Sequence, residues 1–259
     1  MISQPSIRKA PHPTHHDEGH AHLKVLCRAL DISASNECAL CCLKIPALHT
    51  NLASPPHVVE FQRITDVSLR SREILYRESS LGESVYFIRH GLIKLIQYQP
   101  NGRERVLRLL QTGNMLGLES LSGTRYHHEA VALSQVKICR IPHTLFRSLI
   151  AQMLLRFEDL MLRWQQNLDL ADACISQFST GSIQGRVARL LLFLTTAGDL
   201  HHCTTINLLN REDMAATLGV ASESVCRTIS HFRQIGILRL SDTGQYQCDI
   251  EALQKIAAD

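Results

Sequence analysis

The sequence predicts an α+β protein in which a unit of short strands, one long helix and a C-terminal helix-turn-helix with a β-hairpin wing follow one another. Residues from about 58 to 142 form short alternating or β-branched runs that are separated by glycines. From Phe146 onward the apolar residues instead recur every three or four positions. After Gly181, two short helical patterns flank a glycine turn. With 259 residues, 45% of them hydrophobic, the chain is long enough and apolar enough to build these cores.

The first part has the texture of an all-β unit. Runs such as "SVYFIRHGLIKLIQY" and "HEAVALSQVKICRIP" are typical of strands. Asn101-Gly102, between "LIKLIQY" and "ERVLRLL", predicts a hairpin turn. Many short strands with glycine turns indicate a β-barrel, roll or sandwich.

The apolar period from Phe146 to Phe178 predicts a short helix over about 143–152 and a long one over about 154–177. The sequence on either side looks like complete folding units, so the long helix has no obvious partner within the chain. We therefore expect its seam to pair with a second copy, although an ordinary core stripe would show the same spacing. The residues expected in this dimerisation seam are Phe157, Leu160, Trp164, Leu168, Ala171 and Ile175.

The strongest functional signal lies after residue 209. Asn210 is expected to cap a short helix that ends near Leu218, Gly219 to form the turn, and Ser222 to cap a second helix running to Gln234. This pattern is typical of a helix-turn-helix, whose second helix enters the major groove of DNA. A small hairpin around "SDTG" would form its wing.

Glu223 and Arg227 are four residues apart and share one face of the second helix. A carboxylate can accept a hydrogen bond from the cytosine amino group, and a guanidinium can donate two to guanine. An ordinary surface pair on a helix hairpin is the alternative. The residues expected to contact DNA are Arg211, Ser222, Glu223, Cys226, Arg227, Thr228 and His231.

Nine cysteines, an odd number, are scattered along the chain and do not resemble the disulfide framework of a secreted protein. Residues 1–35 read as a flexible tail containing five histidines, without the apolar core of a signal peptide. We therefore expect a cytoplasmic protein that does not enter a membrane. Cys38, Cys41 and Cys42 lie within "NECALCCLKIPAL", and in a reducing compartment such a cluster indicates metal or redox chemistry. The net charge of +3 is too small to decide the partner.

From Cys38 to the C-terminus the chain resembles the superfamily of cyclic-AMP receptor and fumarate-nitrate-reduction regulators. The segments "IRHGLIKL", "VKICRIP" and "LNREDMAATLGVASESVCRTISHFRQIGIL" are similar to the oxygen-sensing fumarate-nitrate-reduction branch. The resemblance implies a cyclic-nucleotide-binding-like sensor β-roll at 36–142, a short helix plus dimerisation helix at 143–180, and a winged helix-turn-helix at 181–259. It also implies a homodimer that binds double-stranded DNA at a TTGAT-like palindrome and contacts RNA polymerase.

The resemblance also bears on the effector. A cyclic-nucleotide pocket needs a glutamate for the ribose and an Arg-Ser or Arg-Thr pair for the phosphate. The segment "GLESLSGTRYHHEAVAL" lacks that pair in register, although Glu119 and Arg125 are nearby, and this disfavours cyclic AMP.

Members of the oxygen-sensing branch hold a [4Fe-4S] cluster on three N-terminal cysteines and one at the end of the roll. Cys139 matches the roll cysteine, whereas the N-terminal spacing departs from the family pattern. With Cys38 and Cys41 as the first pair, the third position falls on Ala47. The expected ligand set is Cys38, Cys41, Cys42 and Cys139, with Cys27 as the alternative to Cys42.

Other chemistries remain open for these thiols. A cluster-free thiol switch needs only two cysteines that can approach each other. Zinc on Cys38, Cys41 and a tail histidine, a heme, or a small molecule bound in the roll are further alternatives. Cys226 stands where the family commonly has serine, and a thiol is a weaker donor and oxidisable. We expect no enzyme, because paired carboxylates, a nucleophile elbow or a phosphate loop are not found at usable spacing.

Overall fold

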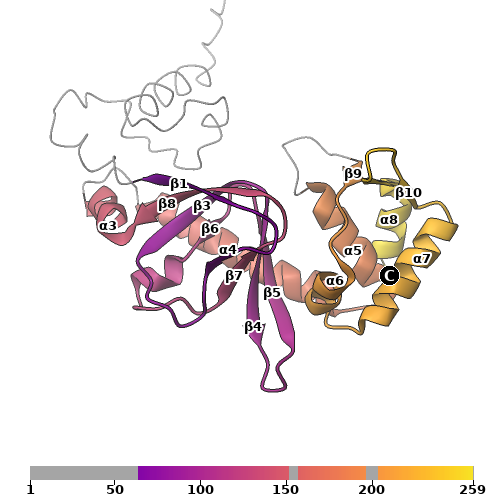
Figure 1. The fold of residues 1–259 in the computed structure, drawn as a ribbon, viewed down its shortest axis with the longest axis horizontal. Helices are drawn as coiled ribbons and strands as arrows, with labels where there is room; N and C mark the ends of the chain where they lie inside the picture. Colours follow the sequence, from indigo (N-terminus) through magenta and orange to yellow (C-terminus); the bar gives the residue numbers. More distant parts are fainter. Residues whose placement is uncertain (1–63, 152–156, 197–203, 259) are drawn as a thin grey trace, which may run out of the picture.

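The computed structural model describes residues 64–151, 157–196 and 204–258 (Figure 1). Within these ranges a β-rich unit is followed by connecting helices and by a helical unit with a small sheet. The predicted fold class is confirmed. The histidine-rich tail and the cysteines at positions 27, 38, 41, 42 and 203 lie outside the described residues.

The β-rich unit is a roll made of two antiparallel sheets. One sheet has the strand order β1-β8-β3-β6 and the other β2-β7-β4-β5. Their inner faces enclose Ile88, Ile93 and Ile138, which are fully buried. The strands are β1 (Thr65–Leu69), β2 (Ile74–Tyr76), β3 (Ser84–His90), β4 (Leu92–Tyr98), β5 (Glu104–Gln111), β6 (Met115–Leu116), β7 (Glu129–Ala132) and β8 (Val136–Pro142), with a short 3-10 helix η4 (Leu118–Leu121) between β6 and β7.

The β4–β5 hairpin turns at the predicted Asn-Gly. The Gln99 amide donates to the Arg103 carbonyl over 2.9 Å, and Gly102 takes a left-handed φ of 75°. Glycine adopts this conformation without steric cost, which explains its place in the turn. The hairpin projects from the roll beside the C-terminal unit (Figure 1).

Three helices lead from the roll to the C-terminal unit: α3 (His143–Ala151), α4 (Phe157–Ser179) and α5 (Ile183–Thr196). The last carbonyls of α4 have no partners within that helix. Two arginines of α5 satisfy them: Arg186 Nε donates to the Phe178 carbonyl over 2.9 Å, and Arg189 Nε donates to the Gln177 carbonyl over 2.7 Å. These bonds fix the angle between α4 and α5.

The C-terminal unit contains the predicted helix-turn-helix and wing. Its helices are α6 (Arg211–Leu218), α7 (Ser222–Gln234) and α8 (Ile250–Ala257), and its sheet has the order β10-β11-β9, with β9 (Thr205–Ile206), β10 (Leu238–Leu240) and β11 (Tyr246–Cys248). The strands β10 and β11 form the expected wing. The third strand, β9, is too short to show a periodic signal in the sequence.

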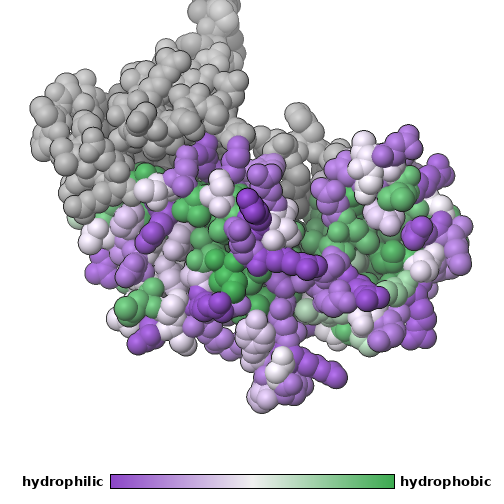
Figure 2. Space-filling view, viewed as in Figure 1, coloured by the Kyte–Doolittle hydropathy of each residue, from purple (hydrophilic) through white to green (hydrophobic). Residues whose placement is uncertain are grey.

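A single apolar core joins the two units. The outer face of β4 contributes Leu92 and Ile96, α4 contributes Phe178, and α6 contributes Met214 and Leu218. Because burial of apolar surface is the main favourable term in protein folding, this shared core holds the C-terminal unit against the roll. Figure 2 shows apolar residues gathered over both units within a mainly hydrophilic surface.

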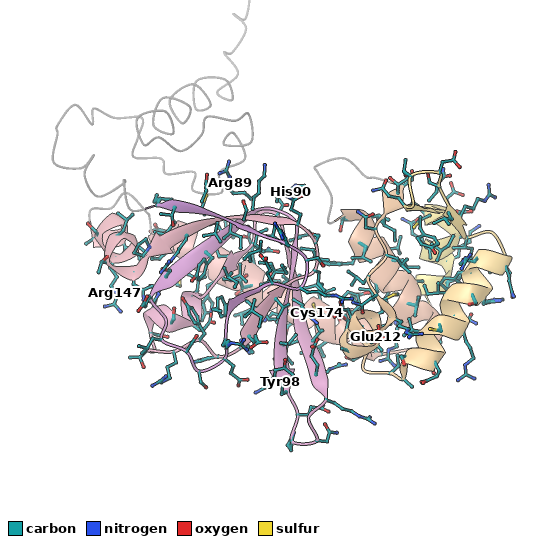
Figure 3. The ribbon with its side chains drawn as sticks, viewed as in Figure 1. Arg89, His90, Tyr98, Arg147, Cys174 and Glu212 are labelled. Atoms are coloured by element: carbon teal, nitrogen blue, oxygen red, sulfur yellow. The ribbon has the colours of Figure 1, made fainter. Side chains whose placement is uncertain are left out.

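Two of the scattered cysteines are part of the packing. Figure 3 shows Cys174 of α4 between the roll and the C-terminal helices. Burial raises the pKa of the Cys174 thiol and raises the pKa of Cys248 to about 11. Both thiols therefore stay protonated near neutral pH, as is typical of buried structural cysteines.

None of the helices in the described ranges combines the length and the apolar character needed to cross a bilayer.

Gly219 ends α6 in the left-handed region at φ 63°, and a Cβ atom there would collide with the guanidinium of Arg105. Gly244 in the wing has a similar φ of 79°, but a Cβ atom added there would meet no atom of the described residues within 4 Å beyond its chain neighbours. We expect Gly244→Ala to lower the free energy of unfolding by about 1 kcal/mol through backbone strain alone. Gly219→Ala should cost more, because the Arg105 guanidinium would also have to give up its bonds to the Ala216 carbonyl and to Ser179 Oγ. Urea unfolding of both variants tests this, and equal losses would contradict it.

Candidate nucleic-acid interface

Local chemistry fixes the helix-turn-helix geometry. The Asn210 side chain caps α6 by accepting from the Asp213 amide over 2.7 Å, as predicted. The Gly219 amide donates back to the Ala215 carbonyl and closes the turn. The predicted cap of α7 is wrong by one residue: Ala221 holds the cap position without a side-chain bond, and Ser222 is the first helical residue.

Helix α7 separates a buried face from an exposed one. Val225, Thr228 and Phe232 face the core of the C-terminal unit. Glu223 and Arg227 are exposed on the other side, and Ser230 and Gln234 continue the same stripe at helical spacing. This exposed stripe carries side chains able to donate to and accept from base edges.

Basic side chains surround the exposed stripe. His231 and Arg233 are exposed in the last turn of α7, and Arg239 is exposed on β10 of the wing. Between α7 and the wing lies an open groove of about 510 Å³ that is lined in part by Arg233 and Arg239. Sequence reasoning missed Arg239, because a basic residue on a three-residue strand has no periodic signal of its own.

The seven residues expected to contact DNA differ in how far they are exposed. Glu223, Arg227 and His231 are exposed on α7, Arg211 is exposed at the start of α6, and Ser222 is half-buried. Thr228 is only 7% exposed, and its hydroxyl donates to the Ser224 carbonyl over 2.9 Å. Thr228 therefore packs within the C-terminal unit, and its hydroxyl is already engaged inside α7.

Cys226 lies between the two helices of the motif. Its half-buried side chain is within hydrogen-bonding reach of Arg211. The bond to Glu212 and, after it, this contact with Cys226 raise the pKa of Arg211. The thiol therefore links the recognition helix α7 to the arginine that begins α6.

Of the four expected cluster ligands, only Cys139 lies in the described part of the chain. It is buried on β8, where the thiol contacts Asp66 Oδ1 over 3.7 Å. Arg89, labelled at the edge of the roll in Figure 3, donates to the same carboxylate oxygen over 2.9 Å. Within the described ranges no three histidine, cysteine or acidic side chains gather as a metal site would require.

The roll interior is crowded with aromatic rings. Tyr76 stacks on Tyr126 with ring centroids 4.0 Å apart, and Tyr86 lies against both. The Tyr126 hydroxyl donates to the Ser84 carbonyl over 2.8 Å. Arg125, one of the two residues weighed for a cyclic nucleotide, is exposed and donates to the Ser79 carbonyl over 2.5 Å.

Helix α4 has an inner and an outer apolar face. Cys174 and Phe178 are buried on the inner face. On the outer face, Trp164, Leu168 and Ile175 are 40, 48 and 63% exposed, and Met161 continues the row. The seam members Phe157 and Leu160 lie at the start of α4, but their side chains are outside the described residues, and Ala171 is half-buried.

Fold and site together define a DNA-binding regulator with an N-terminal roll and a C-terminal winged helix-turn-helix. The roll matches the model of the cyclic nucleotide-binding domain over residues 66–153, and the C-terminal unit matches the Crp-like helix-turn-helix domain over residues 185–256. The chain belongs to the CRP/FNR family of transcription regulators, which are not enzymes.

Individual relatives agree with this assignment. The chain is 28% identical to the transcriptional activatory protein AadR of Rhodopseudomonas palustris, over 77% of this chain and 84% of that protein. It is 26% identical to the nitrogen fixation regulation protein FixK of Bradyrhizobium diazoefficiens, over 85% of this chain and 94% of that protein. The solved structure of FixK2 from Bradyrhizobium japonicum has the same fold, with a TM-score of 0.64 and 23% identity over 76% of this chain and 98% of that one.

The two exposed arginines of α7, one on the exposed stripe and one beside it, are predicted to have different roles. Arg227→Ala should weaken binding to the specific DNA site by about 1–3 kcal/mol and relax the base preference at one position. Arg233→Ala should weaken binding to all DNA sequences similarly and reduce the salt dependence, because it would remove only a phosphate contact. Fluorescence anisotropy with specific and scrambled DNA at several salt concentrations measures both effects. Equal loss on both DNAs for Arg227→Ala would contradict a base contact.

Proposed function

We propose that this regulator is a homodimer that responds to oxygen or redox state and reads a TTGAT-like palindrome in double-stranded DNA. The proposed response to oxygen or redox state rests on the position of Cys139. This residue lies on β8, the last strand of the roll, four residues before α3 begins at His143. A ligand that joined Cys139 to the N-terminal cysteines would tie them to the segment leading into α4.

The proposed ligands are Cys38, Cys41 and Cys139, with Cys42 or Cys27 as the fourth. A [4Fe-4S] cluster, when bound, supplies iron sites for four thiolates and a reaction with oxygen. Cys139 is buried beside the Asp66–Arg89 pair, so its ligation would take place away from bulk water. Because the N-terminal spacing departs from the family pattern, Cys42→Ala and Cys27→Ala variants would show which of the two thiols is the fourth ligand.

The outer face of α4 is the proposed dimer interface. Met161, Trp164, Leu168, Ala171 and Ile175 follow each other at spacings of three and four, which is the pattern of a coiled-coil seam. Large apolar side chains on this face are 40% exposed or more, so pairing with a second α4 would remove them from water. Two paired chains would present two recognition helices to the two halves of a palindrome.

Base contacts are proposed for Glu223 and Arg227, and phosphate contacts for Arg211, His231 and Arg233. A bound dimer would present the exposed surfaces of the roll and of the C-terminal unit to RNA polymerase. Relatives such as AadR, a transcriptional activatory protein, favour activation over repression.

A small-molecule effector in the roll is the second candidate. Among the residues that the structure describes, buried atoms without a hydrogen-bond partner include the Tyr76 hydroxyl, Glu119 Oε1 and His128 Nδ1. Burial raises the pKa of Tyr76 well above its usual value, and the charge of Glu119 raises it further. Burial and the charge of Arg108 lower the pKa of His128. A polar ligand would satisfy these atoms.

The dimer proposal predicts that Leu168→Glu separates the two copies, because the coiled-coil seam would have to bury two carboxylates. Analytical ultracentrifugation under anaerobic conditions should show a dimer for the wild type and a monomer for this variant. Gln165→Glu, on an exposed polar position of the same helix, is the control and should stay dimeric. A dimeric Leu168→Glu protein would place the interface elsewhere.

The cluster proposal predicts that protein purified without oxygen contains about four iron and four sulfide per chain and has a broad visible absorbance that bleaches in air. Cys139→Ala should lose both iron and absorbance. Cys248→Ala removes a buried thiol of the C-terminal unit and should keep both. Colourless wild-type protein that still binds DNA would refute the cluster and favour a thiol switch or the effector in the roll.

A further inference from the structure

Lys94 crosses from the roll to the helix-turn-helix. It lies on the outer face of β4, between Leu92 and Ile96, and its side chain is only 8% exposed. Its ammonium group contacts the Glu104 carboxylate on the neighbouring strand β5. It also donates to Asp213 Oδ1 on α6 over 2.5 Å. One buried cation therefore serves two carboxylates that belong to different units.

The carboxylate on α6 is itself held in place. Asn210 Nδ2 donates to Asp213 Oδ2 over 2.7 Å, and Asn210 Oδ1 accepts from the Asp213 amide over 2.7 Å. Asp213 lies in the first turn of α6, where the helix dipole favours a negative charge. The bond from Lys94 therefore ends on a rigid, capped turn, and holding this carboxylate fixes the start of α6.

A second residue of the hairpin holds the other end of α6. Arg105 of β5 donates to the Ala216 carbonyl over 3.1 Å and to Ser179 Oγ of α4 over 3.2 Å. Its guanidinium lies against Gly219, the turn residue of the motif. The hairpin thus contacts α6 near both of its ends.

These contacts leave the exposed stripe of α7 free. All of them end on α6, on its turn or on α4, whereas Glu223 and Arg227 on α7 stay exposed. Because α6 and α7 pack around a common core, the direction in which α7 points is set by how α6 is held. The outer end of the hairpin and the start of α7 line one open cleft of about 1030 Å³.

We propose that Lys94 and Asp213 are positioning residues for DNA recognition. They hold α6 against the β4–β5 hairpin, so that the recognition helix keeps a fixed direction relative to the roll and to the outer face of α4. This inference rests on the proposed function, in which two recognition helices meet two half-sites at once. Neither residue contacts DNA.

The charge of the buried Lys94 ammonium group is needed to keep the two carboxylates together. Burial lowers the pKa of Lys94, but the bonds to Asp213 and Glu104 raise it by more, so the net pKa is above the ordinary value and the group stays charged. Without the ammonium group, two carboxylates would face each other at the interface with little water to screen them. The contact between β4 and α6 would then loosen and α6 would lose its fixed position, while the shared apolar core still keeps the two units together.

The test uses the full chain and compares Lys94→Met, Asp213→Asn and the double variant. DNA with two half-sites and DNA with one half-site are titrated in parallel by fluorescence anisotropy. For Lys94→Met we expect binding to the two-site DNA to be about tenfold to a hundredfold weaker. The recognition helix of the second chain would no longer be held in the right direction, so its effective concentration at the second half-site would fall. Binding to the one-site DNA should be unchanged. The double variant should lose less than the sum of the single variants, because the two residues act through one contact.

Arg77→Met is the matched control. Arg77 forms an ion pair with Glu129 entirely within the roll; the Arg77 side chain is 70% exposed and that of Glu129 is 8% exposed, so this control tests the loss of a roll cation that does not reach the C-terminal unit. This variant should bind both DNAs as the wild type does. If Lys94→Met folds poorly by circular dichroism, Asp213→Asn, which keeps the shape of the side chain, carries the same test.

Hydrogen exchange without DNA supplies an independent readout. Lys94→Met should speed exchange in α6 and β5, while the strands β3 and β8 of the roll keep the wild-type rate. Unchanged exchange and unchanged two-site binding would overturn the inference, and so would an equal loss on both DNAs. If the wild type itself does not prefer the two-site DNA, the proposed dimeric reader fails, and the exchange experiment still decides whether Lys94 holds α6.

Discussion

Lys94 places one buried cation between Glu104 of its own sheet and Asp213 of α6. Removing a charge from water is costly, and the cost is recovered only when strong partners surround it. Here the partners come from two units, so the full set of bonds exists only while the units are docked. The shared apolar core supplies much of the attraction, and the charged contact adds a defined position and direction. The arrangement of sensor and reader depends on this combination.

Two routes therefore connect the roll with the recognition helix. One follows the chain, from Cys139 on β8 through α3 and α4 to the junction where Arg186 and Arg189 hold α5. The other passes through space, from the β4–β5 hairpin to α6. A change at the end of β8 would act on the first route, and the second would keep α7 aligned with α4. The outer face of α4 lies between the two routes, where pairing of two chains would set the distance between their reading faces.

Local sequence chemistry predicted much of this architecture. The Asn210 cap, the Gly219 turn, the Asn-Gly hairpin and the wing each follow from residues that are neighbours in the chain. One error was a small shift of phase: the cap of α7 is Ala221 instead of Ser222. Thr228 lies on the buried face of the same helix. The bond between Lys94 and Asp213 joins residues 119 positions apart, so no local pattern could reveal it. The spacing of the cysteines indicates a ligand set but does not fix which thiols meet, because that depends on tertiary structure.

In the proposed dimer, two chains read DNA together, with their recognition helices held at a fixed separation. Footprinting and ultracentrifugation on DNA with two half-sites of varied spacing would measure this. We expect two chains to bind each pair of half-sites, and affinity to be highest when the half-sites are centred one helical turn, about 10 base pairs, apart. Adding half a turn would place the second half-site on the opposite face of the DNA and should abolish the gain. Binding by one chain with equal affinity at every spacing would rule out a dimer that reads both half-sites at once.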